Sequence, residues 1–141
     1  MNLFPTNIVK SIKKTETMKS LFIEESKATP KVNFNPNGEL FIHGRSLPED
    51  PVGFYTPVLD WIKDCDCETV TLNLKLEYLN TSSSKQVYSL LCLLNENPVV
   101  KAKSVNWHYE EGDDESFETG KEFESLTKIN FNFYEYAEVP D

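Results

Sequence analysis

Residues 70–94 read VTLNLKLEYLNTSSSKQVYSLLCLL, and they contain the two periodicities that decide the fold. In the first part apolar and polar residues alternate, which is the two-residue period of a strand with one buried face. The apolar positions of that part are Val70, Leu72, Leu74, Leu76 and Tyr78. The second part has apolar residues at i, i+3, i+4 and i+7, the stripe of a helix: Val87, Leu90, Leu91 and Leu94. The sequence therefore predicts a strand followed directly by a helix.

The junction, residues 79–85, reads Leu-Asn-Thr-Ser-Ser-Ser-Lys. Small hydroxyl side chains at a helix start can accept hydrogen bonds from the unpaired amides of the first turn, so capping is one interpretation of this run. The same amides and the helix dipole would also stabilise a phosphate. One hydroxyl suffices for a cap, and here four follow one another, from Thr81 to Ser84. A phosphorylation or anion site is therefore the second interpretation.

Composition bounds the class of protein. A chain of 141 residues with 39% hydrophobic residues is long enough for one globular domain. The net charge of −9 and the single arginine argue against a nucleic-acid-binding face, which needs clustered basic residues. The same charge favours a basic patch on any protein partner. No apolar run approaches the roughly 20 residues of a membrane span, so we expect no membrane association.

The three cysteines are Cys65, Cys67 and Cys92, and no secretory signal is recognisable. An odd number of cysteines without such a signal indicates reduced thiols and a cytoplasmic protein. The Cys-x-Cys pair lacks the further ligands of a zinc site, and we expect no metal and no cofactor.

Along the chain we expect a flexible N-terminal extension (residues 1–27), one α/β domain (28–134) and a frayed acidic tail (135–141). The domain opens with a hairpin, because Val32 and Phe34 alternate with polar residues, as do Leu40 and Ile42, around the turn Asn-Pro-Asn-Gly at 35–38. A constrained loop (44–51) precedes a helix that ends by about residue 66 and turns four residues inward: Tyr55, Val58, Leu59 and Ile62.

After the strand and helix of residues 70–94, we expect a strand over 99–109, a helix over 114–127 and a last strand over 129–133. The inward positions of that helix are Phe117, Gly120, Phe123 and Leu126. The order is then ββαβαβαβ, and its strand–helix–strand units imply right-handed parallel crossovers after the hairpin. Because the strands alternate rather than read as continuous apolar runs, the predicted fold is a mixed sheet with helices mainly on one face.

Few residues offer catalytic chemistry. His43 and His108 stand in no ligand spacing, and no nucleophile-elbow or phosphate-loop motif occurs, so we assign no catalytic residue. The acidic turn of residues 110–116 is best interpreted as a solvated turn whose Asp113 or Asp114 caps the next helix. Arg45 either pairs with a carboxylate such as Glu49 or clamps a phosphate.

Three segments together resemble the SiaC family of bacterial regulatory phosphoproteins. They are Gly-Arg-Ser-Leu-Pro-Glu (44–49), Tyr-Leu-Asn-Thr-Ser-Ser-Ser-Lys (78–85) and Trp-His-Tyr-Glu-Glu (107–111), and the resemblance extends from about Leu21 to Phe133. It implies a fold like that of anti-sigma-factor antagonists (STAS-like). The longer N-terminal extension and the more acidic turn after Tyr109 depart from the family pattern.

The resemblance further implies that Thr81 is phosphorylated by a dedicated protein kinase and dephosphorylated by a PP2C-type phosphatase. It implies a non-enzymatic protein whose unphosphorylated form binds and activates a diguanylate cyclase. The residues that would support the phosphosite or the partner surface are Asn80, Ser82, Ser83, Ser84, Arg45, Ser46 and Glu49.

Three alternatives stay open at this point. Ser82 or Ser83 could be the modified residue instead of Thr81. The target could be an anti-sigma factor or another kinase-like regulator rather than a cyclase. The third alternative is a small metal-dependent hydrolase that uses the acidic turn with His108, which the poor inventory of nucleophiles disfavours.

Overall fold

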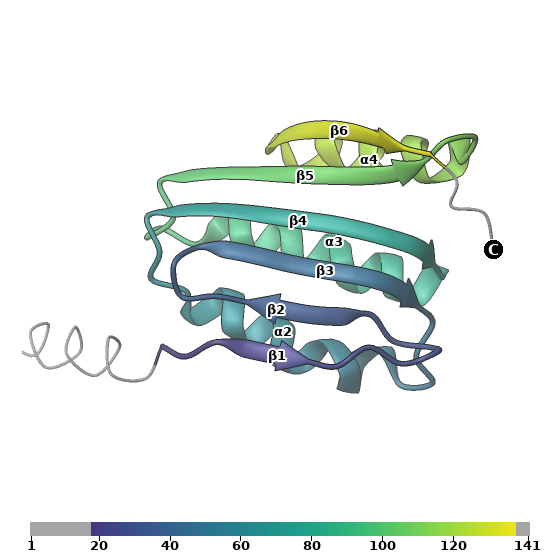
Figure 1. Ribbon diagram of the computed structural model, residues 1–141. Coiled ribbons are helices and arrows are strands. Elements are labelled where there is room, and N and C mark those ends of the chain that lie inside the picture. The colour runs from purple at the N-terminus through teal and green to yellow at the C-terminus, as the bar shows by residue number, and fades with distance from the viewer. Residues whose placement is uncertain (1–17, 138–141) are drawn as a thin grey trace, which may run out of the picture.

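The computed structural model describes residues 18–137, which form a six-stranded sheet covered by helices (Figure 1). The elements are, in chain order, β1 (Leu21–Ile23), β2 (Lys31–Phe34), β3 (Glu39–Ser46), α2 (Pro51–Asp64), β4 (Thr69–Leu79), α3 (Thr81–Glu96), β5 (Ala102–Glu110), α4 (Asp114–Thr127) and β6 (Asn130–Tyr136). No helix within the described range is long and apolar enough to cross a bilayer.

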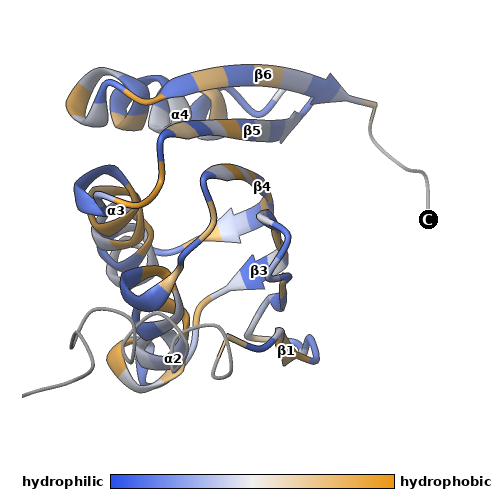
Figure 2. Cartoon of the chain, turned by 90° about the vertical axis from the view of Figure 1, so that its left-hand side faces the viewer, coloured by the Kyte–Doolittle hydropathy of each residue, from blue (hydrophilic) through white to orange (hydrophobic). Residues whose placement is uncertain are grey.

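The strands lie side by side in the order of the chain, from β1 to β6. The first three pair antiparallel, and β3 to β6 pair parallel. Because each right-handed crossover moves one strand further in the same direction, each returning helix packs on the same face of the sheet. Figure 2 shows α2, α3 and α4 together on one side. The predicted mixed sheet with helices on one face is therefore confirmed.

The core lies between the sheet and these helices. The predicted apolar positions of β4 from Val70 to Leu76 are buried, and so is the whole predicted stripe of α3. Burial of each such side chain contributes roughly 1.5–3 kcal/mol. The alternating residues of β4 thus form part of the sheet side of the core, and the apolar stripe of α3 forms part of the helix side.

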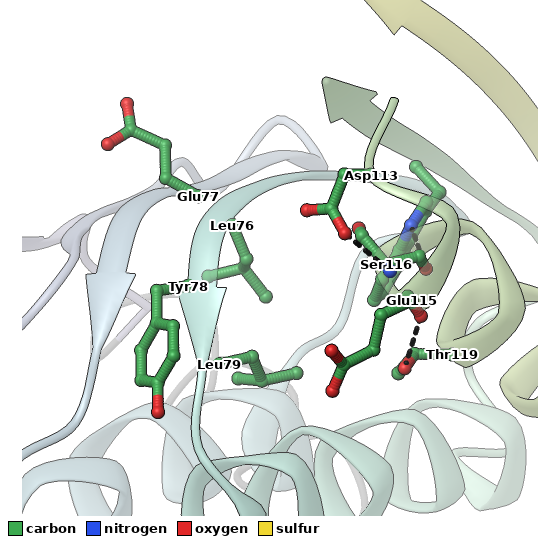
Figure 3. A pocket seen from close by; sticks show the side chains of 9 residues that line it. Leu76, Glu77, Tyr78, Leu79, Asp113, Glu115, Ser116 and Thr119 are labelled. Atoms are coloured by element: carbon green, nitrogen blue, oxygen red, sulfur yellow. Dashed lines mark hydrogen bonds between the residues drawn. The ribbon is translucent and has the colours of Figure 1, made fainter. Parts of the chain in front are cut away.

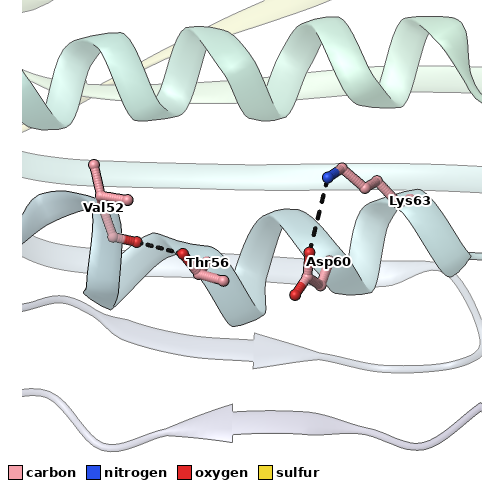
Figure 4. Close-up of polar contacts among 4 residues, drawn as sticks. All are labelled: Val52, Thr56, Asp60 and Lys63. Atoms are coloured by element: carbon pink, nitrogen blue, oxygen red, sulfur yellow. Dashed lines mark hydrogen bonds and ion pairs between the residues drawn. The ribbon is translucent and has the colours of Figure 1, made fainter.

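Helix α2 begins and continues by local interactions. The Asp50 side chain accepts a hydrogen bond from the Gly53 amide (3.0 Å), and Pro51 occupies the first turn, where a missing N–H costs nothing. On the outer surface the Thr56 hydroxyl donates to the Val52 carbonyl (2.7 Å), and Lys63 lies 3.9 Å from Asp60 (Figure 4). These contacts are exposed, so α2 is held mainly by its inward residues.

The face of the sheet away from the helices carries a row of asparagines. Asn132 donates to the Asn106 side chain (3.2 Å), Asn106 donates to Asn73 (2.9 Å), and Asn73 donates to the Leu40 carbonyl (3.2 Å). Next to this ladder, the rings of His108 and Tyr134 stack at 5.1 Å. This row occupies the polar positions that alternate with the core residues.

Several boundaries differ from the expectations, and β5, for example, begins at Ala102 rather than at residue 99. β1 falls inside the stretch assigned to a flexible extension and pairs with β2, so the observed order begins with three strands. The predicted loop starts later, because β3 continues to Ser46. β6 continues to Tyr136, inside the predicted tail. The remainder of the expected extension (1–17) and tail (138–141) lies outside the described residues.

Two predicted inward positions are wrong. Leu126 is 56% exposed, and Thr127 is buried in α4 instead. Tyr78 is 46% exposed, because the pairing of β4 with β3 shifts by one residue near Arg45, so Arg45 faces Tyr78 rather than Glu77. Such a bulge reverses the side-chain alternation beyond it.

Candidate functional site

The junction between β4 and α3 consists of one residue, Asn80. Its amide donates to the Ser46 carbonyl (3.1 Å), which continues the pairing of β4 with β3. Its side chain accepts a hydrogen bond from the Ser83 amide (2.8 Å), and its carbonyl accepts one from the Ser84 amide (2.8 Å). Asn80 is therefore the N-cap of α3, and the interpretation of the hydroxyl run as the cap is wrong.

Thr81 and Ser82 occupy the first two positions of α3 and are exposed. Within the described chain, neither hydroxyl is assigned a hydrogen bond, and Ser84 is half-buried. The first amides of a helix have no intrahelical acceptor, so both hydroxyls lie where the backbone offers unpaired donors. This arrangement leaves both side chains accessible to a modifying enzyme.

Ser83, in contrast, has no solvent exposure. Ser46 donates to its hydroxyl (2.8 Å), and the Tyr55 hydroxyl lies 2.6 Å from the Ser46 oxygen. Because the Ser46 proton is directed to Ser83, Tyr55 donates to Ser46. Burial raises the pKa of Tyr55 to about 12, against the smaller opposing effect of these hydrogen bonds. The chain Tyr55–Ser46–Ser83 joins α2 and β3 to the first turn of α3.

Ser46 and Ser83 are both among the site residues predicted from sequence, whereas their partner Tyr55 is not. Ser83 precedes Val87 by four positions, so it lies in phase with the apolar stripe of α3. That phase is the signal that separates Ser83 from Thr81 and Ser82. Nothing local to Tyr55 indicates its partner, because Ser46 lies nine positions away across a loop.

Arg45 and Glu49 do not form the expected ion pair. The Arg45 guanidinium lies over the Tyr78 ring instead, 5.3 Å from its centroid, and Glu49 is exposed. Both side chains of this stacked pair lie on exposed positions near the carboxyl ends of β3 and β4. The pair is therefore an accessible cationic and aromatic surface beside the β4–α3 junction, because Tyr78 precedes Asn80 by two residues and Arg45 precedes Ser46, whose carbonyl accepts from the Asn80 amide.

The acidic turn behaves as a helix cap. Asp113 accepts a hydrogen bond from the Ser116 amide (3.0 Å), as predicted for a residue that begins α4. His108 is half-buried, and burial, with Lys75 and His43 nearby, lowers its pKa. In the described part of the chain, no group of three or more His, Cys, Asp or Glu side chains is arranged to hold a metal ion.

Comparison with known proteins adds independent information. The model of the SiaC family of regulatory phosphoproteins matches residues 23–136. An uncharacterized protein of Pseudomonas aeruginosa (strain UCBPP-PA14) is 32% identical over 111 residues, which cover 75% of this chain and 88% of that protein.

Two crystal structures have the same fold. The structure of apo-SiaC from Pseudomonas aeruginosa is 31% identical with a TM-score of 0.74, and the match covers 83% of this chain and 99% of that chain. SiaC in complex with the diguanylate cyclase SiaD, which it activates, is 29% identical with a TM-score of 0.75, over 82% of this chain and 99% of that chain.

Proposed function

The chain belongs to the SiaC family of regulatory phosphoproteins, and from this membership we propose that it is a non-enzymatic switch controlled by phosphorylation of Thr81. A protein kinase adds the phosphate, and a PP2C-type phosphatase removes it. The unphosphorylated form binds and activates a diguanylate cyclase in the cytoplasm.

The observation that carries this proposal is the exposure of Thr81 on a firmly held helix start. Asn80 caps the helix, and Ser83 anchors it to Ser46 and Tyr55. The Thr81 hydroxyl takes no part in either arrangement. A phosphate on Thr81 therefore breaks none of these interactions, and the positive end of the helix dipole favours its charge.

The same geometry explains how a phosphate would control binding. Phosphorylation adds about 1.5 to 2 negative charges at neutral pH. The fold keeps its shape, while a partner packed over the first turn of α3 meets new bulk and charge. A cyclase is the proposed partner because a solved relative is the activator of one.

Burial discriminates among the neighbouring hydroxyls. Ser83 is sealed within the protein, so a kinase could reach it only after the start of α3 had opened. Ser82 is exposed and remains the competitor of Thr81. The proposal therefore needs a test that separates these two adjacent positions.

Site-resolved mass spectrometry of protein isolated from its own cells should find the phosphate on Thr81. Thr81→Ala should abolish it, and the matched control Ser82→Ala should retain it. In a binding assay with a diguanylate cyclase from the same cells, Thr81→Asp and the phosphorylated protein should bind more weakly than the unmodified protein. Equal affinity of all three forms would refute the switch.

A further inference from the structure

A pocket of about 90 Å³ lies beside the end of β4, between β4 and the start of α4 (Figure 3). β4 stays paired with β3 as far as Leu79, but its pairing with β5 ends at Lys75 opposite His108. From Leu76 to Leu79, β4 therefore has no strand paired to it on the β5 side. The first residues of α4 lie next to this unpaired end of β4. The pocket thus follows from the separation of two neighbouring parallel strands.

The pocket combines an apolar floor with a carboxylate. Leu76, Leu79 and Trp107 line it, and Figure 3 shows the Glu115 side chain on the wall opposite Tyr78. Trp107 is held in place, because its indole N–H donates to the Ser116 carbonyl (3.1 Å). No lysine, arginine or histidine is among the lining residues.

Glu115 is the pocket carboxylate that is available to bind a cation. Asp113 also lines it but is used as the cap of α4. Glu77 lies 4.0 Å from His43, and in Figure 3 its carboxylate points away from the pocket. Glu115 is exposed, and no ion pair joins it to another described residue.

The helix dipole accounts for part of this arrangement. An acidic residue in the first turn of a helix is stabilised by the positive end of the dipole. The dipole supplies only about half an elementary charge, whereas Asp113, Asp114 and Glu115 are all acidic. It also gives no reason for an open apolar floor, whereas the Tyr78 ring already contacts the Arg45 guanidinium. The remaining negative charge and the floor together indicate an occupant.

We propose that this pocket receives an arginine or lysine side chain of the protein partner. The methylenes of such a side chain would cover Leu76, Leu79 and Trp107, and its cationic end would reach Glu115, as long basic side chains do on apolar surfaces. The volume suits one side chain, because sites for whole small ligands measure roughly 300–1,000 Å³. The net charge of −9 favours a basic partner surface in general.

This inference rests on the proposed function, since it assigns the partner to the same surface as Thr81. Leu79, which lines the pocket, is two positions from Thr81. The partner would therefore cover the phosphosite while one basic side chain enters the pocket beside it.

The test uses N-acetyl-arginine methylamide as the probe and its neutral counterpart N-acetyl-citrulline methylamide as the control. In NMR titrations, the arginine probe should shift the Trp107 indole N–H and the Leu79 and Thr119 amides, with Trp61 as the internal reference. Glu115→Gln should weaken this binding by about two- to fivefold, the range of an exposed ion pair. Glu118→Gln, one turn further along α4, should leave it unchanged.

Equal binding of the citrulline probe, or equal loss in Glu118→Gln, would overturn the proposal. The result is independent of the phosphorylation switch, because Thr81→Asp adds negative charge and should not weaken binding of a small cation. Loss of cyclase binding in Thr81→Asp with intact arginine binding supports both proposals. Absence of arginine binding in the unmodified protein removes only this one.

Discussion

Thr81 and Ser83 stand two positions apart on the same helix, and their hydroxyls have opposite surroundings. Ser83 has no exposure and is bonded to Ser46, whereas Thr81 lies on the outside of the first turn. Two positions on a helix correspond to about 200 degrees of rotation, so one side chain faces the core and the other faces solvent. The comparison teaches that a run of similar residues can divide into a structural part and an accessible part by helical phase alone.

The largest expected effect comes from placing a charge at the buried position. Ser83→Asp would put a carboxylate where no water reaches, next to Ser46 and Tyr55, and we expect a loss of several kcal/mol in the free energy of unfolding. Urea denaturation followed by circular dichroism measures it. Ser82→Asp is the matched control and should change stability by no more than about 0.5 kcal/mol. Similar losses in both variants would show that Ser83 is not sealed.

Alkaline pH tests the same cluster through Tyr55. Burial raises its pKa to about 12 in the folded protein, whereas an unfolded tyrosine has a pKa near 10. Because the folded-state pKa is the higher one, the folded state holds the proton more tightly. The associated stability is complete below pH 10 and is lost as pH rises toward 12, by up to about 3 kcal/mol. Chemical denaturation at several alkaline pH values should show this loss in the free energy of unfolding. In Tyr55→Phe, the part of the loss that comes from ionisation of Tyr55 should be absent.

At neutral pH, Tyr55→Phe should cost about 1–2 kcal/mol. The substitution keeps the ring but removes the donor that lies 2.6 Å from the Ser46 oxygen, so a buried hydroxyl loses a partner. Tyr134→Phe is the control, because that ring is exposed on the open face of the sheet. Chemical denaturation of both variants measures the difference, and an equal cost would contradict the assigned role of the buried chain of hydroxyls.

A smaller loss of stability is expected for substitution of Asn80, which precedes Thr81 and accepts a hydrogen bond from the Ser83 amide. Asn80→Ala removes the acceptor for the Ser83 amide and should cost about 1 kcal/mol, the usual contribution of an N-cap. Asn80→Asp keeps an acceptor and should retain most of the stability. Thermal denaturation compares the three proteins, and unchanged stability in Asn80→Ala would indicate that α3 starts elsewhere.

Local periodicity predicted most of this architecture. β4, α3 and the helix over residues 114–127 follow from alternation or from a stripe that spans many positions. β1 has three residues, which is too short for a period to be recognised. The exposed side of Tyr78 depends on a shift in pairing with β3, which residues near Tyr78 do not reveal.

The candidate site also has features that local sequence predicts and features that only the folded chain shows. Exposure of Thr81 and burial of Ser83 could both have been inferred from the phase of Val87 and the stripe that follows it. The bond from Ser46 to Ser83 spans 37 positions, and the pocket at Glu115 combines β4 and α4, so both require the folded chain. Sequence thus locates the segment proposed to be regulated and the phase of its hydroxyls, whereas the partners of the buried hydroxyl follow only from tertiary contacts.

The smallest expected effect on stability belongs to the residue with the largest proposed role. Thr81→Val keeps the size of the side chain and removes a hydroxyl that is assigned no hydrogen bond within the described residues, so the free energy of unfolding should change by less than about 0.5 kcal/mol. Ser83→Ala, measured in the same denaturation series, should cost about 1 kcal/mol because Ser46 loses its acceptor. A cost at Thr81 equal to that at Ser83 would mean that both hydroxyls hold the helix start. In that case a phosphate could not be added to Thr81 without disturbing the fold, since the modified oxygen would already be needed there.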